Sequence, residues 1–513
     1  MKRIPEIKRE NGIPTLFARE QPFLAFAGEV HNSSASSLAF MEERVWPAIE
    51  GMNLNTLIVP LYWELVEPEE GKFDFRLLEG LTAQAQSRDM HLILLWFGLW
   101  KNSESMYVPN WMKLDSNKYF RVKKANGEKI DTISPFCSAA IEKDARAFSR
   151  VMARLREIDE DHSTVIAIQV ENEIGVLGTE RDYCEAAQCA FAEEIPDTMA
   201  AKFRVKGNWK AAFGTDAEEY FMAYYFAQAV ETITREGRKE YPLPCYANAW
   251  LKQHPWYPGS YPSGGPVKGV HRIWKYMAPS LFTLAPDIYV PSAAAVMEEY
   301  HYENNPLLIP EARKDAVTAS YCLYAFTRHH AVCYSPFGIE DLGLPADQVM
   351  KPSKEVMKEL NINPIMFETD GGKEYLSKVY DVMEQMKPLY FKYRGTGHMQ
   401  SYLKCSETDL GTYFRFDEYD ILTDYFPSMP GIPISAGVIY ELDQNKFLMV
   451  GMMSRMTFRV KPGENRKVRA LKLEDGELVQ GEWKPGHIQN GDEQMQFHFG
   501  PSPSWLYVEL YKY

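Results

Sequence analysis

Eight short apolar runs, separated by segments with helical periodicity, constrain the fold of this chain more than any other feature. Each run is nearly continuous in apolar residues, as is typical of strands that a parallel sheet buries on both faces. Between the runs, apolar residues recur at three- and four-residue spacing, for example over 149–158 and 220–240, which indicates amphipathic helices. The expected strands are 23–30, 55–63, 91–98, 163–171, 243–250, 286–290, 306–311 and 331–338.

This count of strands alternating with helices is typical of a (β/α)8 TIM barrel, an α/β fold. A doubly wound sheet is the alternative, but no GxGxxG follows any of the runs, so the barrel is favoured. The segment 256–269 is rich in Pro, Gly and Tyr. We expect it to form a long loop, of the kind that serves as a lid or binding loop.

After about residue 395 helical periodicity fades and short strand patterns appear, punctuated by the turn signals PGIP, KPGEN, EDGE and QNGDE. We therefore predict a barrel domain over 1–395 and a C-terminal all-β, sandwich-like domain over 396–513. A helical stretch at 380–395 runs into the second domain without a flexible linker, so the two should pack together. The expected strands are 436–442, 446–453, 456–460, 468–474, 494–499 and 504–512.

Composition excludes several classes of function. The chain has 513 residues and a net charge of −14 without a cluster of basic residues, so a nucleic acid partner is not expected. Seven cysteines without a CxxC pair indicate neither a zinc ribbon nor a dithiol centre, and favour free thiols in a reducing compartment. Neither a secretory signal nor an apolar run of membrane-spanning length is visible, so we expect a cytoplasmic protein without a membrane partner.

Two carboxylates follow expected strands at the positions where barrel enzymes place catalytic groups. The fourth run ends in Glu171-Asn172-Glu173, and the seventh ends in Pro310-Glu311. Single glutamates at strand ends are most often solvated loop residues or helix N-terminal charges. A pair of them at the mouth of one barrel is, however, what glycoside hydrolysis requires: one protonates the leaving oxygen and the other attacks the anomeric carbon.

Three motifs resemble known glycoside hydrolases. QVENEIG (169–175) is similar to the acid/base motif of family 35, whose Asn-Glu ending is shared across clan A, including family 42. YWELVEPEEGKFDF (62–75) resembles the second-strand signature of these families, and VPNWM (108–112) resembles a family 35 segment after the third strand. The resemblance covers about residues 20–340, with its motifs in the expected order.

The resemblance implies that Glu173 is the acid/base, that Asn172 binds the sugar 2-hydroxyl and that Glu311 is the nucleophile. Tyr289 would support the nucleophile, and we expect Arg313 or another nearby cation to keep that nucleophile ionised. The sequence departs from family 35 after the first strand and at the nucleophile's neighbours. It also lacks the acidic residue expected after the third strand. These departures concern the identity of the sugar more than the reaction.

Other polar and aromatic residues near strand ends complete the predicted site. Aromatic side chains there could stack on pyranose faces, and polar ones could bind hydroxyls. His31 has no partner histidine at ligand spacing, so no metal is expected. The candidates for stacking are Trp63, Trp100, Trp250 and Phe337. The candidates for hydroxyl contacts are Glu29, His31, Asn248 and Glu340.

From these observations we expect a retaining exo-β-galactosidase that acts on glycosides or oligosaccharides without a cofactor. The alternatives are a retaining β-glycosidase for another glycone (a glucoside, xyloside or arabinopyranoside) and a non-catalytic carbohydrate-binding protein. Family 42 relatives are often trimeric, so the resemblance also allows a homo-oligomer, a dimer or a trimer.

Overall fold

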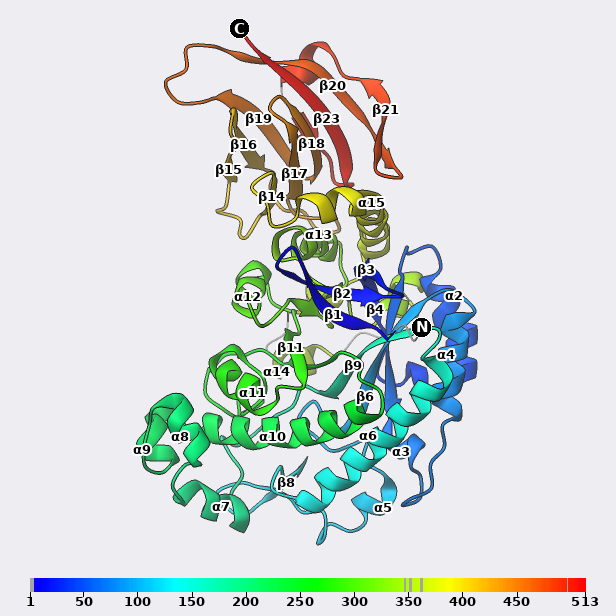
Figure 1. Cartoon of the computed structure of the whole chain (residues 1–513), viewed down its shortest axis with the longest axis vertical. Helices are drawn as coiled ribbons and strands as arrows, with labels where there is room; N and C mark the ends of the chain where they lie inside the picture. The colour runs from blue at the N-terminus through cyan, green and yellow to red at the C-terminus, as the bar shows by residue number, and fades with distance from the viewer. Residues whose placement is uncertain (1–3, 346, 350–352, 360–362, 496) are drawn as a thin grey trace.

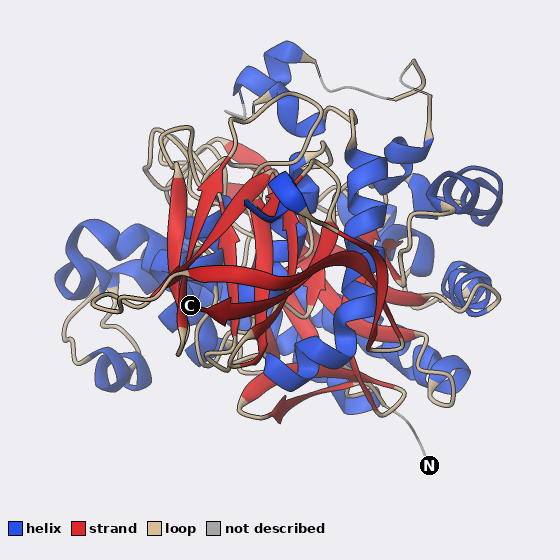
Figure 2. Cartoon of the chain, turned by 90° about the horizontal axis from the view of Figure 1, so that it is seen from above, coloured by secondary structure: helices blue, strands red, loops and turns tan. Residues whose placement is uncertain are grey.

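The computed structural model describes residues 4–345, 347–349, 353–359, 363–495 and 497–513. It has two tiers along its long axis, with a barrel below and antiparallel sheets above (Figure 1). In the view from above, the helices lie at the periphery and the strands in the middle (Figure 2). No helix in the described part of the chain is long and apolar enough to cross a membrane.

The lower tier is the predicted (β/α)8 barrel. Its eight strands are all parallel and lie in the order β11-β10-β9-β6-β5-β4-β13-β12. A parallel bridge between Ile288 and Ala312, just beyond β11 and β12, joins the two edges of the sheet at its mouth. The strands are β4 (Ala25–Glu29), β5 (Thr56–Tyr62), β6 (His91–Lys101), β9 (Val165–Asn172), β10 (Cys245–Ala249), β11 (Leu281–Pro286), β12 (Leu308–Ile309) and β13 (Cys333–Tyr334).

Two of the differences from the predicted strand boundaries bear on the site. The sixth strand is 281–286 and not 286–290, because the apolar run LFTLAP pairs with β10, and the polar Asp287 then follows Pro286 where the chain leaves the sheet. The third strand continues to Lys101 instead of ending at Gly98. Its pairing with β9 is irregular between Trp96 and Lys101. Both differences fall at the mouth of the barrel, where they move polar residues into the site.

Helices follow the strands around the barrel, as the spacing of apolar residues predicts. The predicted segments 149–158 and 220–240 lie within α6 and α10, whose apolar stripes are buried. An antiparallel sheet of β1 (Glu6–Glu10), β2 (Ile13–Ala18) and β3 (Gln21–Phe23) precedes the barrel and was not predicted. The main helices are α4 (Arg76–Gln86), α6 (Ser138–Asp159), α10 (Ala217–Glu240), α11 (His271–Met277), α12 (Ala293–Tyr300) and α13 (Val317–His329).

The upper tier consists of two antiparallel sheets. The six-stranded sheet has the order β14-β17-β18-β23-β20-β21, and the four-stranded sheet has the order β15-β16-β19-β22. The EDGE segment, predicted as a turn, lies inside β20, where a register shift between Glu474 and Gly476 accommodates it. The strands are β14 (Met399–Leu403), β15 (Gly411–Arg415), β16 (Tyr419–Tyr425), β17 (Ala436–Asp443), β18 (Lys446–Met452), β19 (Ser454–Val460), β20 (Val468–Val479), β21 (Glu482–Ile488), β22 (Phe497–Phe499) and β23 (Ser504–Lys512).

The central strand β18 of the six-stranded sheet is buried on both faces. Along β18, Phe447 and Met449 pack into the core shared with the four-stranded sheet, whereas Leu448 and Val450 join the main core of the molecule. Helix α15 (Gly372–Tyr393) connects the tiers. Its Tyr380 donates a hydrogen bond to the Ala27 carbonyl of β4 (2.7 Å). Its Gln385 accepts a hydrogen bond from Trp505 of the upper tier. The β-sheets thus pack against the barrel, as predicted.

Candidate active site

The end of β9 presents Asn172 and Glu173 to the mouth of the barrel. Neighbouring residues of a regular strand point to opposite faces, but Glu171 and Glu173 both have left-handed backbone conformations, with φ of 63° and 46°. This departure from strand geometry brings Asn172 and Glu173 to the same side. Backbone conformations of this kind are strained for residues other than glycine, and they gather at functional sites.

Glu311, just beyond β12, lies opposite Glu173 and accepts hydrogen bonds at both oxygens. Asn172 Nδ2 donates to its Oε1 (3.1 Å) and the Tyr289 hydroxyl donates to its Oε2 (2.9 Å). Asn248 Nδ2 also reaches Oε1 at 3.5 Å. These donors favour an ionised carboxylate, which is the form that a nucleophile needs.

Glu173 has the opposite environment. Burial, followed by the negative charge of Glu311, raises its pKa to about 8, although Lys101 opposes this shift. Its backbone N–H donates to Asn248 Oδ1 (2.9 Å). A carboxylic acid that keeps its proton near neutral pH can act as a general acid, so the two glutamates differ in the way that a division of roles requires.

Asp287 is a third buried carboxyl in the site, and the sequence analysis missed it. Single carboxylate oxygens of Glu173, Asp287 and Glu311 lie within 4.8 Å of one another. Asn248 Nδ2 donates to Asp287 Oδ2 (2.8 Å). Because the sixth strand was placed five residues too late, Asp287 was counted as part of the strand. A polar residue directly after an apolar run was the signal that could have identified it.

Glu29 and Lys101 lie on the other side of the same mouth. Glu29 ends β4 and is fully buried, and neither of its carboxylate oxygens has a hydrogen-bond partner among the described residues. Burial, followed by the charge of Glu311, raises its pKa well above the usual range. Lys101 ends β6, where the resemblance implies an acidic residue, and its Nζ donates to Asn172 Oδ1 (2.9 Å). Lys101, too, was missed because its strand was expected to end earlier.

Three more predicted residues gather beside Glu29. Phe337, which follows β13, forms a parallel β-bridge with Glu29. The His31 ring contacts Phe337 edge-on (5.2 Å between centroids), and the His31 backbone N–H donates to Glu340 Oε1 (3.0 Å). The second oxygen of Glu340 has no partner among the described residues. Their role in binding substrate stays a prediction.

Two of the predicted stacking residues are core residues instead. Trp63 is fully buried, and its Nε1 donates to Glu67 Oε2 (2.9 Å) behind the barrel wall. Trp100 is also fully buried, and its Nε1 donates to the Ile133 carbonyl (3.0 Å). Trp63 directly follows β5 and Trp100 lies near the end of β6, but both side chains pack in the core instead of entering the mouth. Trp250 remains half-buried on the loop after β10.

The expected cation beside the nucleophile also lies elsewhere. Arg313 forms two hydrogen bonds with Asp315 (2.5 and 2.6 Å), so its charge is already paired. Lys101, which lowers the pKa of Glu173 and of Glu29, is the cation that acts on the carboxyl cluster. The cause is the length of β6, which delivers Lys101 into the mouth.

Glu173, Asp287 and Glu311 form the carboxyl cluster of the mouth. Among the described residues, these three also lie close enough together to hold a metal ion. Glu311 and Asp287, however, already accept hydrogen bonds from amide and phenol donors, and the pKa of both Asp287 and Glu173 is raised, above all by burial. Metal ligands must instead be deprotonated. The site therefore fits hydrogen-bonded and protonated carboxyls better than it fits a metal.

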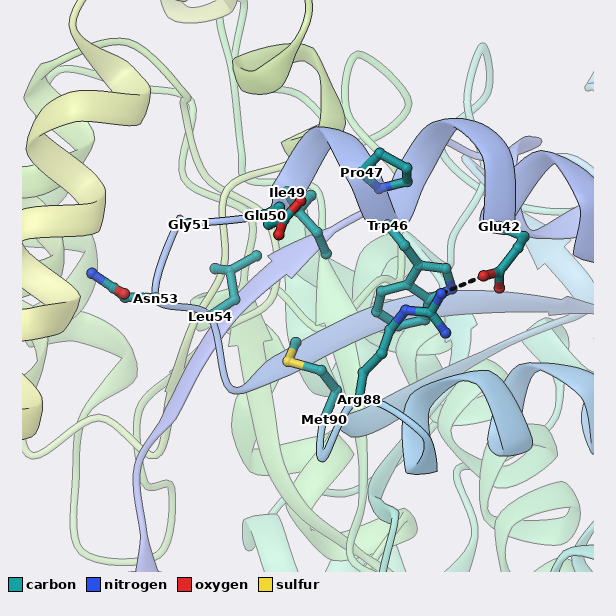
Figure 3. Close-up of a pocket in the computed structure, with 10 residues that line it drawn as sticks. All are labelled: Glu42, Trp46, Pro47, Ile49, Glu50, Gly51, Asn53, Leu54, Arg88 and Met90. Carbon is teal, nitrogen blue, oxygen red and sulfur yellow. Dashed lines mark hydrogen bonds and ion pairs between the residues drawn. The ribbon is translucent and has the colours of Figure 1, made fainter.

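The molecule also has a hollow that lies away from the candidate active site. A hollow of about 560 Å³ lies at the opposite end of the barrel, where residues before β5 and β6 line it (Figure 3). There Arg88 lies over the Trp46 ring (5.0 Å) and pairs with Glu42. Its lining holds none of the candidate catalytic residues.

Comparison with known families supports the resemblance found in the sequence. Residues 49–221 match the family described as beta-galactosidase (glycoside hydrolase 42), and this segment contains Asn172 and Glu173. Residues 376–500 match a domain of unknown function, DUF5597. No curated protein sequence matches the chain.

Several solved structures are similar to this chain at low sequence identity. The beta-galactosidase from Marinomonas ef1 is 13% identical, with 61% of this chain and 53% of that one covered and a TM-score of 0.42. The beta-galactosidase from Rahnella sp. R3 is 12% identical, with 71% and 57% covered and a TM-score of 0.48. The chain therefore spans little more than half the length of these two proteins. The beta-galactosidase from Bacillus circulans sp. alkalophilus is 11% identical, with 94% and 99% covered and a TM-score of 0.49.

The barrel, the two glutamates at its mouth and the family match over residues 49–221 together make this chain similar to glycoside hydrolases of clan A.

Proposed function

We propose that this protein is a retaining exo-β-galactosidase that releases terminal galactose from β-galactosides. The observation that carries the proposal is the pairing of Glu173 and Glu311, whose nearest oxygens lie within 4.8 Å of each other. Retaining glycosidases hold their carboxyl groups about 5–5.5 Å apart, whereas inverting enzymes leave roughly 6.5–9.5 Å for a water molecule. The galactose preference rests on the family match alone.

In the first step, Glu311 attacks the anomeric carbon while Glu173 gives its proton to the glycosidic oxygen, and the aglycone leaves. Asn172 and Tyr289 hold the attacking carboxylate in place. In the second step, Glu173, now ionised, takes a proton from water, and the resulting hydroxide displaces Glu311 from the sugar. The two carboxyls perform both steps, so the reaction needs no cofactor.

A different glycone is the second candidate, and Lys101 favours it. Where the resemblance implies a carboxylate that accepts hydrogen bonds from sugar hydroxyls, this chain places an ammonium group that can only donate them. Such a change alters which hydroxyl pattern fits the site without affecting the two glutamates.

A panel of nitrophenyl β-glycosides tests the proposal. The galactoside should be cleaved fastest, ahead of the glucoside, the xyloside and the α-arabinopyranoside, and Glu311→Ala should cleave none of them. Proton NMR of the first product should show the β-anomer. Preferred cleavage of another glycoside would support the second candidate, an α-anomer would contradict retention, and sugar binding without turnover would indicate a carbohydrate-binding protein.

A further inference from the structure

Asp287 is fixed between the two catalytic glutamates by the backbone on both sides. Its own N–H donates to the Ala249 carbonyl at the end of β10 (3.1 Å). The next N–H, of Ile288, donates to the Glu311 carbonyl (2.8 Å). The carboxyl therefore stays at the seam where the barrel closes, with oxygens of Glu173 and Glu311 both within 4.8 Å.

Within the described part of the chain, only one of the two carboxylate oxygens of Asp287 receives a hydrogen bond. Asn248 Nδ2 donates to Oδ2 (2.8 Å), whereas Oδ1 receives no hydrogen bond from an amide, hydroxyl or cationic group of the described residues. The Glu173 carboxyl, with an oxygen within 4.8 Å of the Asp287 carboxyl, is placed to become its hydrogen-bond partner, and their interaction lowers the pKa of Glu173 and raises that of Asp287. Two carboxyls can bond in this way only when at least one of them holds a proton.

We propose that Asp287 is a positioning residue of the acid/base: it stays protonated and donates a hydrogen bond to Glu173 when Glu173 becomes ionised. As the glycosidic bond breaks, the Glu173 proton passes to the leaving oxygen and a carboxylate forms in a buried site. A donor already in place stabilises that developing charge, which water cannot reach. The proton of Asp287 itself is not transferred. This inference rests on the proposed function.

The surrounding charges favour the protonated form of Asp287. Burial, followed by the charges of Glu311 and Glu173, raises the pKa of Asp287 well above its usual range. Lys101 is the nearby cation that acts on Glu173 and Glu29, and it already donates to two asparagine side chains. The titratable groups that act on Asp287 or feel its charge are Glu29 on β4, Glu173 after β9, Tyr246 on β10, Tyr289, Tyr300 on α12 and Glu311 after β12.

The test uses Asp287→Ala and Asp287→Asn, with aryl glycosides of the preferred sugar that have good and poor leaving groups. Asp287→Ala should slow a phenyl glycoside about 10- to 100-fold, the value of one hydrogen bond to a charged group, and affect a 2,4-dinitrophenyl glycoside much less. Without the donor, ionised Glu173 is less stable, so the alkaline limb of kcat/KM should move up by about one pH unit. Asp287→Asn keeps a neutral donor, so it should lose less activity and leave that limb in place.

The matched control is Asp159→Asn. Asp159 is also a buried aspartate with a raised pKa, because burial penalises its charge, but it holds backbone N–H groups before β9, at the far end of the strand from Glu173. Its variant should lose stability and keep the wild-type pH profile.

Each other outcome overturns the inference. If Asp287→Asn moved the alkaline limb down by a unit or more, Asp287 would be ionised in the wild type. If Asp287→Ala slowed both leaving groups equally and left the limb unmoved, Asp287 would serve only to hold Asn248. If Asp287→Ala fails to fold, the position of the alkaline limb of kcat/KM in Asp287→Asn still tests the inference. A wild-type protein that cleaves no glycoside would instead overturn the proposed function, and this inference with it.

Discussion

Two acidic clusters lie on opposite sides of β9, only two residues apart in the sequence. Behind the strand, Glu171 lies beside Asp144 of α6, whose negative charge adds to burial in raising the pKa of Glu171. In the mouth, Glu173 lies with Asp287 and Glu311. Both clusters are buried, and burial raises the pKa of a carboxyl in each.

The clusters differ in how their oxygens are satisfied. In the rear pair, Trp96 Nε1 and the Leu99 N–H donate to Asp144 (2.8 and 2.9 Å), and the Trp100 N–H donates to Glu171 (2.6 Å). In the mouth, Asp287 Oδ1 and both oxygens of neighbouring Glu29 have no such donors among the described residues. Three of the four oxygens of the rear pair thus receive a donor, and only Glu171 Oε1 has none among the described residues. Carboxyls held by several donors stabilise a fold, whereas oxygens without donors leave hydrogen-bonding capacity for a ligand.

The largest expected effect comes from the nucleophile. Glu311→Ala should reduce kcat by at least about 10⁴-fold on every substrate, because no covalent intermediate can form. It should not lower the thermal unfolding temperature by more than a degree or two, since it also removes a like charge from beside Glu173. Steady-state kinetics and calorimetry measure the two effects. A large loss of stability with residual activity would contradict the idea that the rear pair stabilises the fold while the cluster in the mouth serves the reaction.

The acid/base variant should have a smaller and substrate-dependent effect. Glu173→Ala should lose about 10²- to 10⁴-fold in kcat/KM on glycosides with poor leaving groups and partly spare activated aryl glycosides, whose phenolate leaves without a proton. Added azide should rescue it with a β-glycosyl azide as the product, whereas Glu311→Ala should give the α-anomer. The opposite anomers, identified by NMR, would reverse the two assignments.

Disturbing the rear pair should lower the stability of the fold more than it lowers activity. Gly98 leaves space for this pair, because a Cβ there would lie 2.4 Å from Asp144 Oδ2 and 2.6 Å from Glu171 Oε1. Gly98→Ala should therefore lower the free energy of unfolding by about 1–3 kcal/mol, the cost of disturbing buried hydrogen bonds. Urea unfolding measures it. Glu171→Gln, which keeps a donor toward Asp144, should lose less.

The last test concerns the pH dependence of stability. Burial raises the pKa of Asp144 to about 6 and, with the charge of Glu311, that of Glu173 to about 8, so the folded chain holds protons that the unfolded chain releases at lower pH. Stability should therefore fall as the pH rises from about 5 to 8, by ~1.4 kcal/mol per pH unit for each such proton. Glu173→Gln should make this fall less steep. Urea midpoints at several pH values measure it, and an equal slope in both proteins would contradict the raised pKa of Glu173.

The fold could be predicted in outline because its signal is repeated. Eight buried runs and the intervening helices identify the barrel even though one run was misplaced by five residues. The position of Glu173 and Glu311 at the mouth of the barrel could be predicted because both directly follow apolar runs. Asp287 and Lys101 could not, because each depends on where a strand ends, and pairing with a neighbouring strand decides that. Trp63 and Trp100 also lie at the ends of strands, but strand position alone does not show which way a side chain packs.

The sequence by itself determined the alternation of strands and helices, the change to antiparallel sheets near residue 395 and the two glutamates at strand ends. These are local patterns of hydrophobicity and residue type. Only the tertiary structure decided that Glu171 and Glu173 lie on opposite sides of one strand, that Arg313 pairs with Asp315, and that Asp287 lies beside Glu173 and Glu311. The physical reason is that side-chain direction, burial and charge pairing arise from contacts between segments far apart in the chain.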